Sequence, residues 1–120
     1  MPPLRSRLDT ICSGLPGAGK SDPWGGGHDA WKVGGKMFAC IGAVDPGVSV
    51  KTPDTETATM LIEAGVGTRA PYFHRSWIRL PEDVPEDELR HRVVVSYDIV
   101  RGSLTKKLQA TLAPRPDMED

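Results

Sequence analysis

The stretch GLPGAGKS, Gly14 to Ser21, satisfies the pattern G-x-x-x-x-G-K-[ST] of phosphate-binding loops. In nucleotide-hydrolysing enzymes this loop joins a buried strand to a helix, so that backbone N–H groups and the helix N-terminus point at the phosphates. Here the preceding apolar residues recur at steps of three and four, which predicts a helix before the loop. Pro23 and the glycines 25–27 disfavour a helix after it. We therefore expect a turn at Gly14–Ser21 that binds no nucleotide.

The other side chains with catalytic or metal-binding chemistry are scattered along the chain. His28, His74 and His91 fall in separate expected elements, with no paired spacing typical of a metal site. Cys12 and Cys40 lie in apolar patterns, where cysteine behaves as a small hydrophobic residue. The sequence therefore predicts reduced, buried cysteines and a protein that is not an enzyme. No catalytic residue, metal ligand or cofactor is expected.

Composition limits the classes of partner. The chain has 120 residues and a formal net charge of −1, with 15 Lys and Arg against 16 Asp and Glu. General electrostatic capture by nucleic acid is not expected at this charge, although a local basic face remains open. No apolar run approaches the roughly 20 residues of a membrane span, and the first residues lack the hydrophobic stretch of a signal peptide. We expect one cytoplasmic domain over residues 1–113, a polar tail over 114–120 and no membrane partner.

Hydrophobic periodicity and turn residues predict a two-layer α+β domain around an antiparallel sheet. A helix comes first, and a three-stranded meander follows over 30–51, with a Gly-Gly turn after its first strand. A second helix begins near Thr52 and ends at Gly65 or Gly67, and one or two strands follow, of which 77–80 is the clearest. Two helices, beginning near Pro85 and Ser103, complete the chain. In the second strand of the meander, residues 36, 38 and 40 are expected on one face and residues 37, 39 and 41 on the other.

Several longer stretches carry a family resemblance. They are LPGA (15–18), KVGGKMFA (32–39), VSVKTP (48–53), PYFH with Trp77, and SYDIVRGSLTKKL (96–108). With them the chain resembles the MmcQ/YjbR family of small bacterial proteins over nearly its whole length, although its triple glycine and shorter YFHRSW segment depart from the family pattern. The resemblance implies a fold similar to secretion chaperones and to a double-wing DNA-binding domain. It thereby implies DNA binding by analogy of fold.

Strand alternation suggests where a ligand would bind. Lys51 and Arg79 alternate with apolar residues, and Trp77 shares the face of Arg79. An aromatic ring beside cations can stack on bases or anchor a protein partner. The candidate binding residues are Lys32, Lys36, Lys51, Arg75, Trp77 and Arg79. Three interpretations remain open: weak, salt-dependent DNA binding, a protein partner for an adaptor or chaperone-like domain, or a solvated basic surface with Trp77 packed under a helix.

The Gly14–Ser21 turn leads to a first prediction. We expect Lys20→Ala to change the free energy of unfolding by no more than about 0.5 kcal/mol, as is usual for surface substitutions. Calorimetric titration with ATP should give no binding heat for either protein. Micromolar ATP binding by the parent protein that disappears in Lys20→Ala would contradict the prediction.

Overall fold

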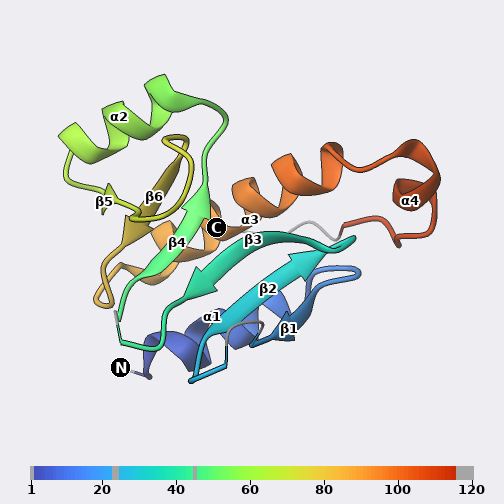
Figure 1. Cartoon of the computed structure of the whole chain (residues 1–120), viewed down its shortest axis with the longest axis horizontal. Coiled ribbons are helices and arrows are strands. Elements are labelled where there is room, and N and C mark those ends of the chain that lie inside the picture. Colours follow the sequence, from blue (N-terminus) through green and yellow to red (C-terminus); the bar gives the residue numbers. More distant parts are fainter. Residues whose placement is uncertain (1, 23–24, 45, 116–120) are drawn as a thin grey trace.

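The computed structural model describes residues 2–22, 25–44 and 46–115. The elements are α1 (Leu4–Cys12), β1 (Gly19–Ser21), β2 (Asp29–Val33), β3 (Lys36–Ile41), β4 (Val48–Lys51), α2 (Thr55–Glu63), β5 (Thr68–Arg69), β6 (Trp77–Leu80), α3 (Glu86–Gly102) and α4 (Lys106–Ala110). The described strands form an antiparallel sheet in the order β1-β2-β3-β4-β6-β5 (Figure 1). The predicted α+β class is confirmed, and the predicted meander corresponds to β2, β3 and β4.

The expected turn at Gly14–Ser21 is shorter than the sequence suggested. Backbone hydrogen bonds close it between Leu15 and Ala18, and residues 19–21 then form the edge strand β1, with Lys20 opposite Trp31 of β2. All three residues of β1 are exposed. A short, exposed edge strand has no alternating apolar pattern, because neither of its faces is buried, so hydrophobic periodicity does not reveal it.

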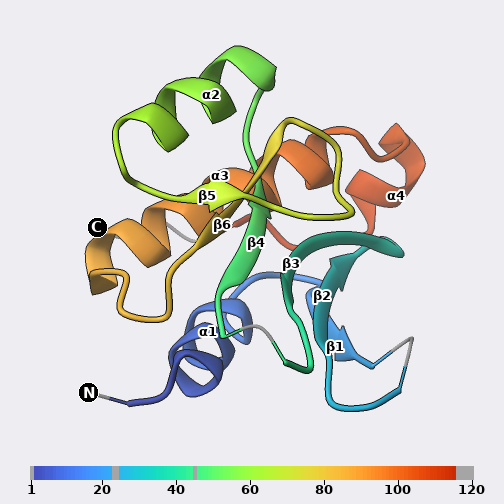
Figure 2. The same ribbon diagram turned by 60° about the vertical axis from the view of Figure 1, so that its left-hand side comes forward.

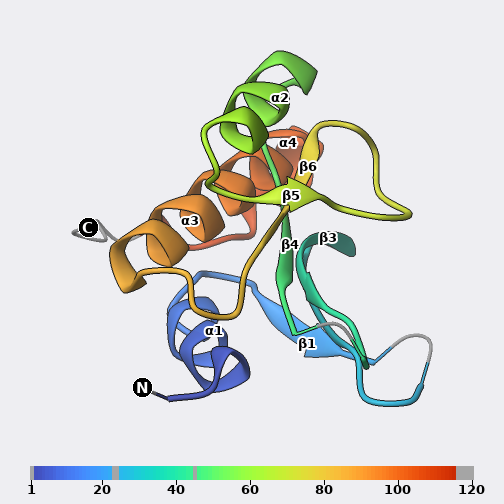
Figure 3. The same ribbon diagram turned by 90° about the vertical axis from the view of Figure 1, so that its left-hand side faces the viewer.

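Helices α1 and α3 lie on one side of the sheet, and α2 packs against β6 (Figures 1 and 2). The loops β1–β2 and β5–β6 project on the other side (Figure 3). We call this other side of the strands the helix-free face. By strand pairing and alternation its residues are Gly19, Ser21, Ala30, Lys32, Met37, Cys40, Ser49, Lys51, Thr68, Trp77 and Arg79. The hydrophobic core fills the space between the opposite face and the helices.

A β-bulge in β3 changes the expected faces of this strand. Trp31 of β2 pairs with Ala39, whereas the next residue, Lys32, pairs with Met37, so Phe38 has no direct partner. Phe38 therefore turns into the core, where its ring meets Tyr97 of α3 edge to face at 5.4 Å. The expectation that residues 36, 38 and 40 share a face was wrong, because one unpaired residue reverses the alternation on one side of it.

Ser96 of α3 bridges β3 and β4 at Phe38, the residue at which β3 bulges from β2. Its hydroxyl donates to the carbonyl oxygen of Phe38 at 2.6 Å and accepts from the backbone N–H of Lys51 at 2.9 Å. In a regular ladder these strand groups would bond to each other, so a helix side chain here replaces a strand-to-strand hydrogen bond. Ser96 is fully buried, and water therefore has no access to satisfy the two backbone groups in its place.

Arg7 of α1 provides a second tie, from the first helix to the turn before α3. Its side chain is 2% exposed, and its Nε lies 3.2 Å from Oε1 of Glu86. The same guanidinium donates to the carbonyl oxygens of Glu82 and Val84. A buried arginine is tolerated only when its N–H groups are satisfied, and here two carbonyls and a carboxylate accept from it.

We predict that Ser96→Ala lowers the free energy of unfolding by about 1–3 kcal/mol, because it leaves buried backbone groups without a partner. Urea denaturation followed by circular dichroism measures the change. Ser6→Ala, the same replacement at an exposed position of α1, is the matched control and should stay within about 0.5 kcal/mol of the parent protein. Equal stability of the two variants would contradict a bridging role for Ser96.

Candidate nucleic-acid interface

The phosphate-loop pattern occupies a different setting from that of nucleotide-hydrolysing enzymes. Helix α1 precedes it and its last three residues form strand β1, which reverses the usual order of a strand before and a helix after the loop. The carbonyl oxygen of Pro16 accepts a 2.6 Å hydrogen bond from Tyr97, which holds the turn against α3. Nζ of Lys20 lies 3.1 Å from Asp9 and 5.8 Å from the centre of the Trp31 ring. The lysine thus contacts α1 and β2 on the helix-covered side of the sheet.

The helix-free face differs from the rest of the molecule in its charge. Lys32, Lys51 and Arg79 lie on its strands, and none of the strand residues on this face is acidic. Asp29, the acidic residue of β2, belongs to the opposite face and pairs with Arg5 of α1 at 3.0 Å. Apart from Asp22, the other described carboxylates lie on α1, at the N-cap of α2 and along it, on α3, and on the turn between β6 and α3. A chain with a net charge of −1 therefore has a local basic surface.

One described carboxylate lies in a loop on the side of the helix-free face. Asp22 accepts hydrogen bonds from the backbone N–H groups of Gly27 and His28 at 2.9 and 3.1 Å. These bonds, led by that of Gly27, hold the pKa of Asp22 below its usual range, with a smaller contribution from the His28 charge. Its negative charge is thus used to shape the β1–β2 loop. Asp45 lies outside the described residues.

Lys51 is half-buried and reaches toward the β5–β6 loop. Its Nζ donates to Oγ of Ser76 at 3.1 Å, and Oγ also lies 2.9 Å from Nδ1 of His74. The hydroxyl of Thr52 donates to the carbonyl oxygen of Ser76 at 2.7 Å. Together these contacts fasten the end of the loop to β4. Ser76 is itself buried, whereas His74 is exposed.

Trp77 does not offer the open stacking surface that strand alternation suggested. It lies on the helix-free face, opposite Lys51, but only 8% of it is exposed. Phe73 stacks on its ring, with centroids 4.6 Å apart and planes 28° apart. The β5–β6 loop, rather than a helix, therefore covers the tryptophan. Alternation gives the side of the sheet on which a residue lies, but it does not show which loop folds over it.

Tyr72 is the aromatic residue that the loop exposes. It is fully exposed and has a φ of +70°, a conformation that non-glycine residues rarely adopt. Sequence reasoning did not single it out, because a loop residue has no periodic signal. The available hint was the PYFH segment, where three ring-containing side chains follow a proline in a short loop.

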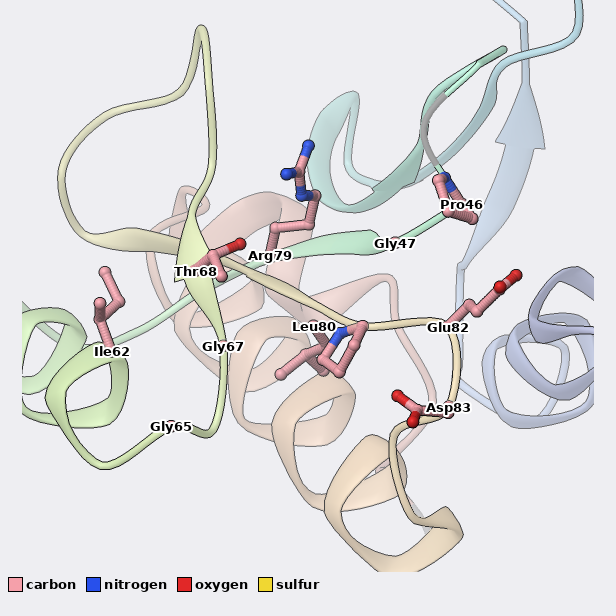
Figure 4. A pocket seen from close by; sticks show the side chains of 11 residues that line it. Pro46, Gly47, Ile62, Gly65, Gly67, Thr68, Arg79, Leu80, Glu82 and Asp83 are labelled. Carbon is pink, nitrogen blue, oxygen red and sulfur yellow. The ribbon is translucent and has the colours of Figure 1, made fainter.

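A hollow of about 760 Å³ lies on the helix-free face between the loops. Its lining includes Cys40 and Ser49 of the sheet, Val44 of the β3–β4 connection, and Tyr72 and Phe73 of the β5–β6 loop. Arg79 also lines it and lines a second hollow of about 730 Å³, which is bounded by Glu82 and Asp83. In Figure 4 the guanidinium of Arg79 points away from these two carboxylates.

Gly47 positions Arg79 by giving its stem room. A Cβ atom at Gly47 would lie 2.8 Å from Cγ of Arg79 and 2.5 Å from the carbonyl oxygen of Leu80. No larger residue fits there without displacing β6. The aliphatic part of Arg79 is therefore packed against the β3–β4 connection, and its guanidinium stands between the two hollows.

The structure brings together some of the candidate residues and separates others. Lys32, Lys51, Trp77 and Arg79 share the helix-free face, and Arg75 is exposed in the adjoining loop. Lys36 pairs with Val33, whose side chain belongs to the core, so the bulge places Lys36 on the other side of the hairpin. Its assignment to the common face was wrong.

A metal-binding group and a membrane-spanning helix are both absent from the described part of the chain. Within ranges 2–22, 25–44 and 46–115, no group of three or more His, Cys, Asp or Glu side chains could hold a metal ion. In the same ranges, no helix has both the length and the apolar character needed to cross a bilayer.

Comparisons with known proteins agree on the fold. The model of the YjbR family matches residues 13–99. Among curated proteins, none matches the chain. The crystal structure of the Deinococcus radiodurans protein DR2400, with domain DUF419, superposes with a TM-score of 0.77 at 23% identity. The alignment covers 87% of this chain and 83% of that one. At this identity the similarity establishes a shared fold.

Both cysteines are buried, as predicted, and their different surroundings give a test of the site's geometry. Burial, with a smaller effect of Asp9, raises the pKa of the Cys12 thiol. Burial and Asp29 raise the pKa of Cys40, against a smaller opposing effect of Arg5. Because the thiolate is the reactive form, we predict slow labelling of both thiols at neutral pH. Cys40, which lines the hollow, should react before Cys12. Equal, fast labelling in the folded protein would contradict this packing.

Proposed function

Because the chain belongs to the YjbR family, with the family fold and a charge-segregated sheet, we propose that it is a non-enzymatic protein that binds DNA through the helix-free face. The observation that carries the proposal is the absence of acidic residues among the strand residues of that face, where Lys32, Lys51 and Arg79 lie. Phosphate contacts by such side chains supply affinity without sequence preference. The binding is weak and depends on salt, because few basic residues contribute to it.

The proposal of a non-enzymatic role has its own support. Lys51, Ser76 and His74 have the residue types of an activated nucleophile. Oγ of Ser76 lies 3.1 Å from Nζ of Lys51 and 2.9 Å from Nδ1 of His74. Ser76 is only 3% exposed, however, so a substrate has no approach to its hydroxyl. In addition, Nδ1 of His74 accepts from the backbone N–H of Ser76 at 3.1 Å. The three residues act as a fastening of the loop.

A protein-binding adaptor is the second candidate, and two exposed apolar side chains favour it. Val44 is 95% exposed and Tyr72 is fully exposed, and both line the same hollow. An interface centred on such residues gains its free energy from apolar burial and changes little with salt. Salt dependence therefore distinguishes the two candidates.

We predict that the affinity for a labelled oligonucleotide, measured by fluorescence anisotropy, falls as the salt concentration rises. In the double variant Lys51→Gln with Arg79→Gln, the slope of log affinity against log salt should decrease by about 2, since each lost phosphate contact removes about one counterion. Binding should weaken alike for all sequences. Glutamine preserves most of the length of each side chain and its capacity to donate hydrogen bonds.

The matched control is Lys106→Gln with Lys107→Gln, which removes the same charge from exposed positions on α4. Its salt slope should equal that of the parent protein. If the two double variants lose affinity equally, the helix-free face is not the site. If neither duplex nor single-stranded oligonucleotides bind at low salt, the proposal of DNA binding is wrong.

A further inference from the structure

The position of Tyr72 is fixed by the loop around it. Arg69 donates to the carbonyl oxygens of Ala70 and Phe73 at 2.6 and 3.0 Å, which closes the loop on either side of Tyr72. Phe73 is in turn stacked on the buried Trp77. The backbone of Tyr72 is thus held at a positive φ, while its ring extends fully into solvent. An aromatic ring held in this way loses little conformational freedom when it binds a ligand.

The hollow beside this ring suits a flat, partly polar group. Its volume of about 760 Å³ lies within the range of roughly 300–1,000 Å³ typical of ligand pockets. Val44 and Pro71 offer apolar contact at its sides, and the guanidinium of Arg79 provides positive charge at its border with the second hollow. A nucleotide of a single strand matches this arrangement, because its base can stack on an aromatic residue while its phosphate contacts an arginine.

The charges around the hollow indicate a path for a nucleic-acid backbone. Arg79 and Lys51 lie on neighbouring strands of the helix-free face, and Arg75 lies in the loop beside them. On the other side of Arg79, the second hollow is bordered by Glu82 and Asp83 (Figure 4). Phosphates are repelled there, so the path that fits a polyanion runs from the hollow across Arg79 toward Lys51.

From these observations we propose that the helix-free face binds single-stranded nucleic acid, with one unpaired base stacked on Tyr72 in the hollow and the adjoining phosphates at Arg79 and Lys51. The inference rests on the proposed nucleic-acid function and specifies its ligand. In a duplex every base is already stacked between its neighbours, so Tyr72 has no free base to contact unless the helix is opened. The β5–β6 loop, which carries Tyr72, projects on the side of this face (Figure 3).

The test compares three labelled probes of about 15 nucleotides at one low salt concentration, a length that spans the site sizes of single-strand binders. The probes are oligothymidylate, the same strand paired with oligoadenylate, and a strand of the same length whose sugars carry no bases. We expect the oligothymidylate to bind most tightly. The abasic strand, which retains the phosphates, should bind more weakly with the same salt slope, because only stacking has been removed.

Two variants at position 72 separate stacking from folding. Tyr72→Ala should weaken oligothymidylate binding roughly 5- to 150-fold, the equivalent of one lost base–aromatic stack, and should leave abasic binding unchanged. Tyr72→Gly should lose the same affinity while unfolding at a higher temperature than Tyr72→Ala, because glycine adopts the positive φ without strain. Tyr72→Phe should bind as the parent protein does. Met60→Ala, at an exposed apolar residue of α2, is the control for loss of exposed apolar surface.

The outcomes separate the two proposals. If the duplex binds as tightly as the single strand, or if Tyr72→Ala and Tyr72→Gly bind oligothymidylate as the parent does, the single-strand inference is overturned. The proposed DNA-binding function then survives whenever the Lys51 and Arg79 double variant still lowers the salt slope. If none of the probes binds, both proposals fail.

Discussion

The hydroxyl of Ser96 is the contact that joins α3 to the sheet between β3 and β4. The paired residues of these strands end at Ala39 and Val50, and the hydroxyl bridges the next two residues, since it accepts from the backbone N–H of Lys51 and donates to the carbonyl oxygen of Phe38. Phe38 is also the residue at which β3 bulges from β2, and its ring turns into the core toward Tyr97 of α3. Ser96 is fully buried, so water has no access to replace it between the two backbone groups. The bulged end of β3 is therefore held to β4 by a helix side chain.

The two sides of the sheet use their charges differently. On the helix-covered side, basic residues serve the fold, since Arg7 joins α1 to the turn before α3 and Arg5 pairs with Asp29. On the helix-free face, the strands carry basic side chains and no acidic ones. Lys51 links both uses, because its backbone N–H binds Ser96 while its ammonium group fastens the β5–β6 loop at Ser76. A contact of the core and a contact of the candidate site therefore meet in one residue.

Much of the fold could be predicted from the sequence, because amphipathic periods and turn residues report local structure directly. The meander, the long helix 86–102 and the burial of both cysteines follow from such patterns. The Ser96 bridge could not be predicted in this way, since the serine lies 58 positions from Phe38. For the same reason the burial of Arg7 was missed, because its partners Glu82, Val84 and Glu86 lie 75 to 79 positions away. The periodicity of one segment carries no information about such a distant partner. Phe73 lies only four positions from Trp77, and its cover of that ring was missed because the loop before β6 has no periodic pattern.

The basic strands of the helix-free face belong to a nearly neutral chain, with a formal net charge of −1. Net charge and the isoelectric point of about 6.3 average over all titratable groups, so neither quantity reveals a face whose strands carry Lys32, Lys51 and Arg79 without a carboxylate. At physiological ionic strength, charges more than roughly 8 Å apart are largely screened from each other. A polyanion at this face therefore interacts with the local charge, and the carboxylates on distant parts of the surface have little effect on it.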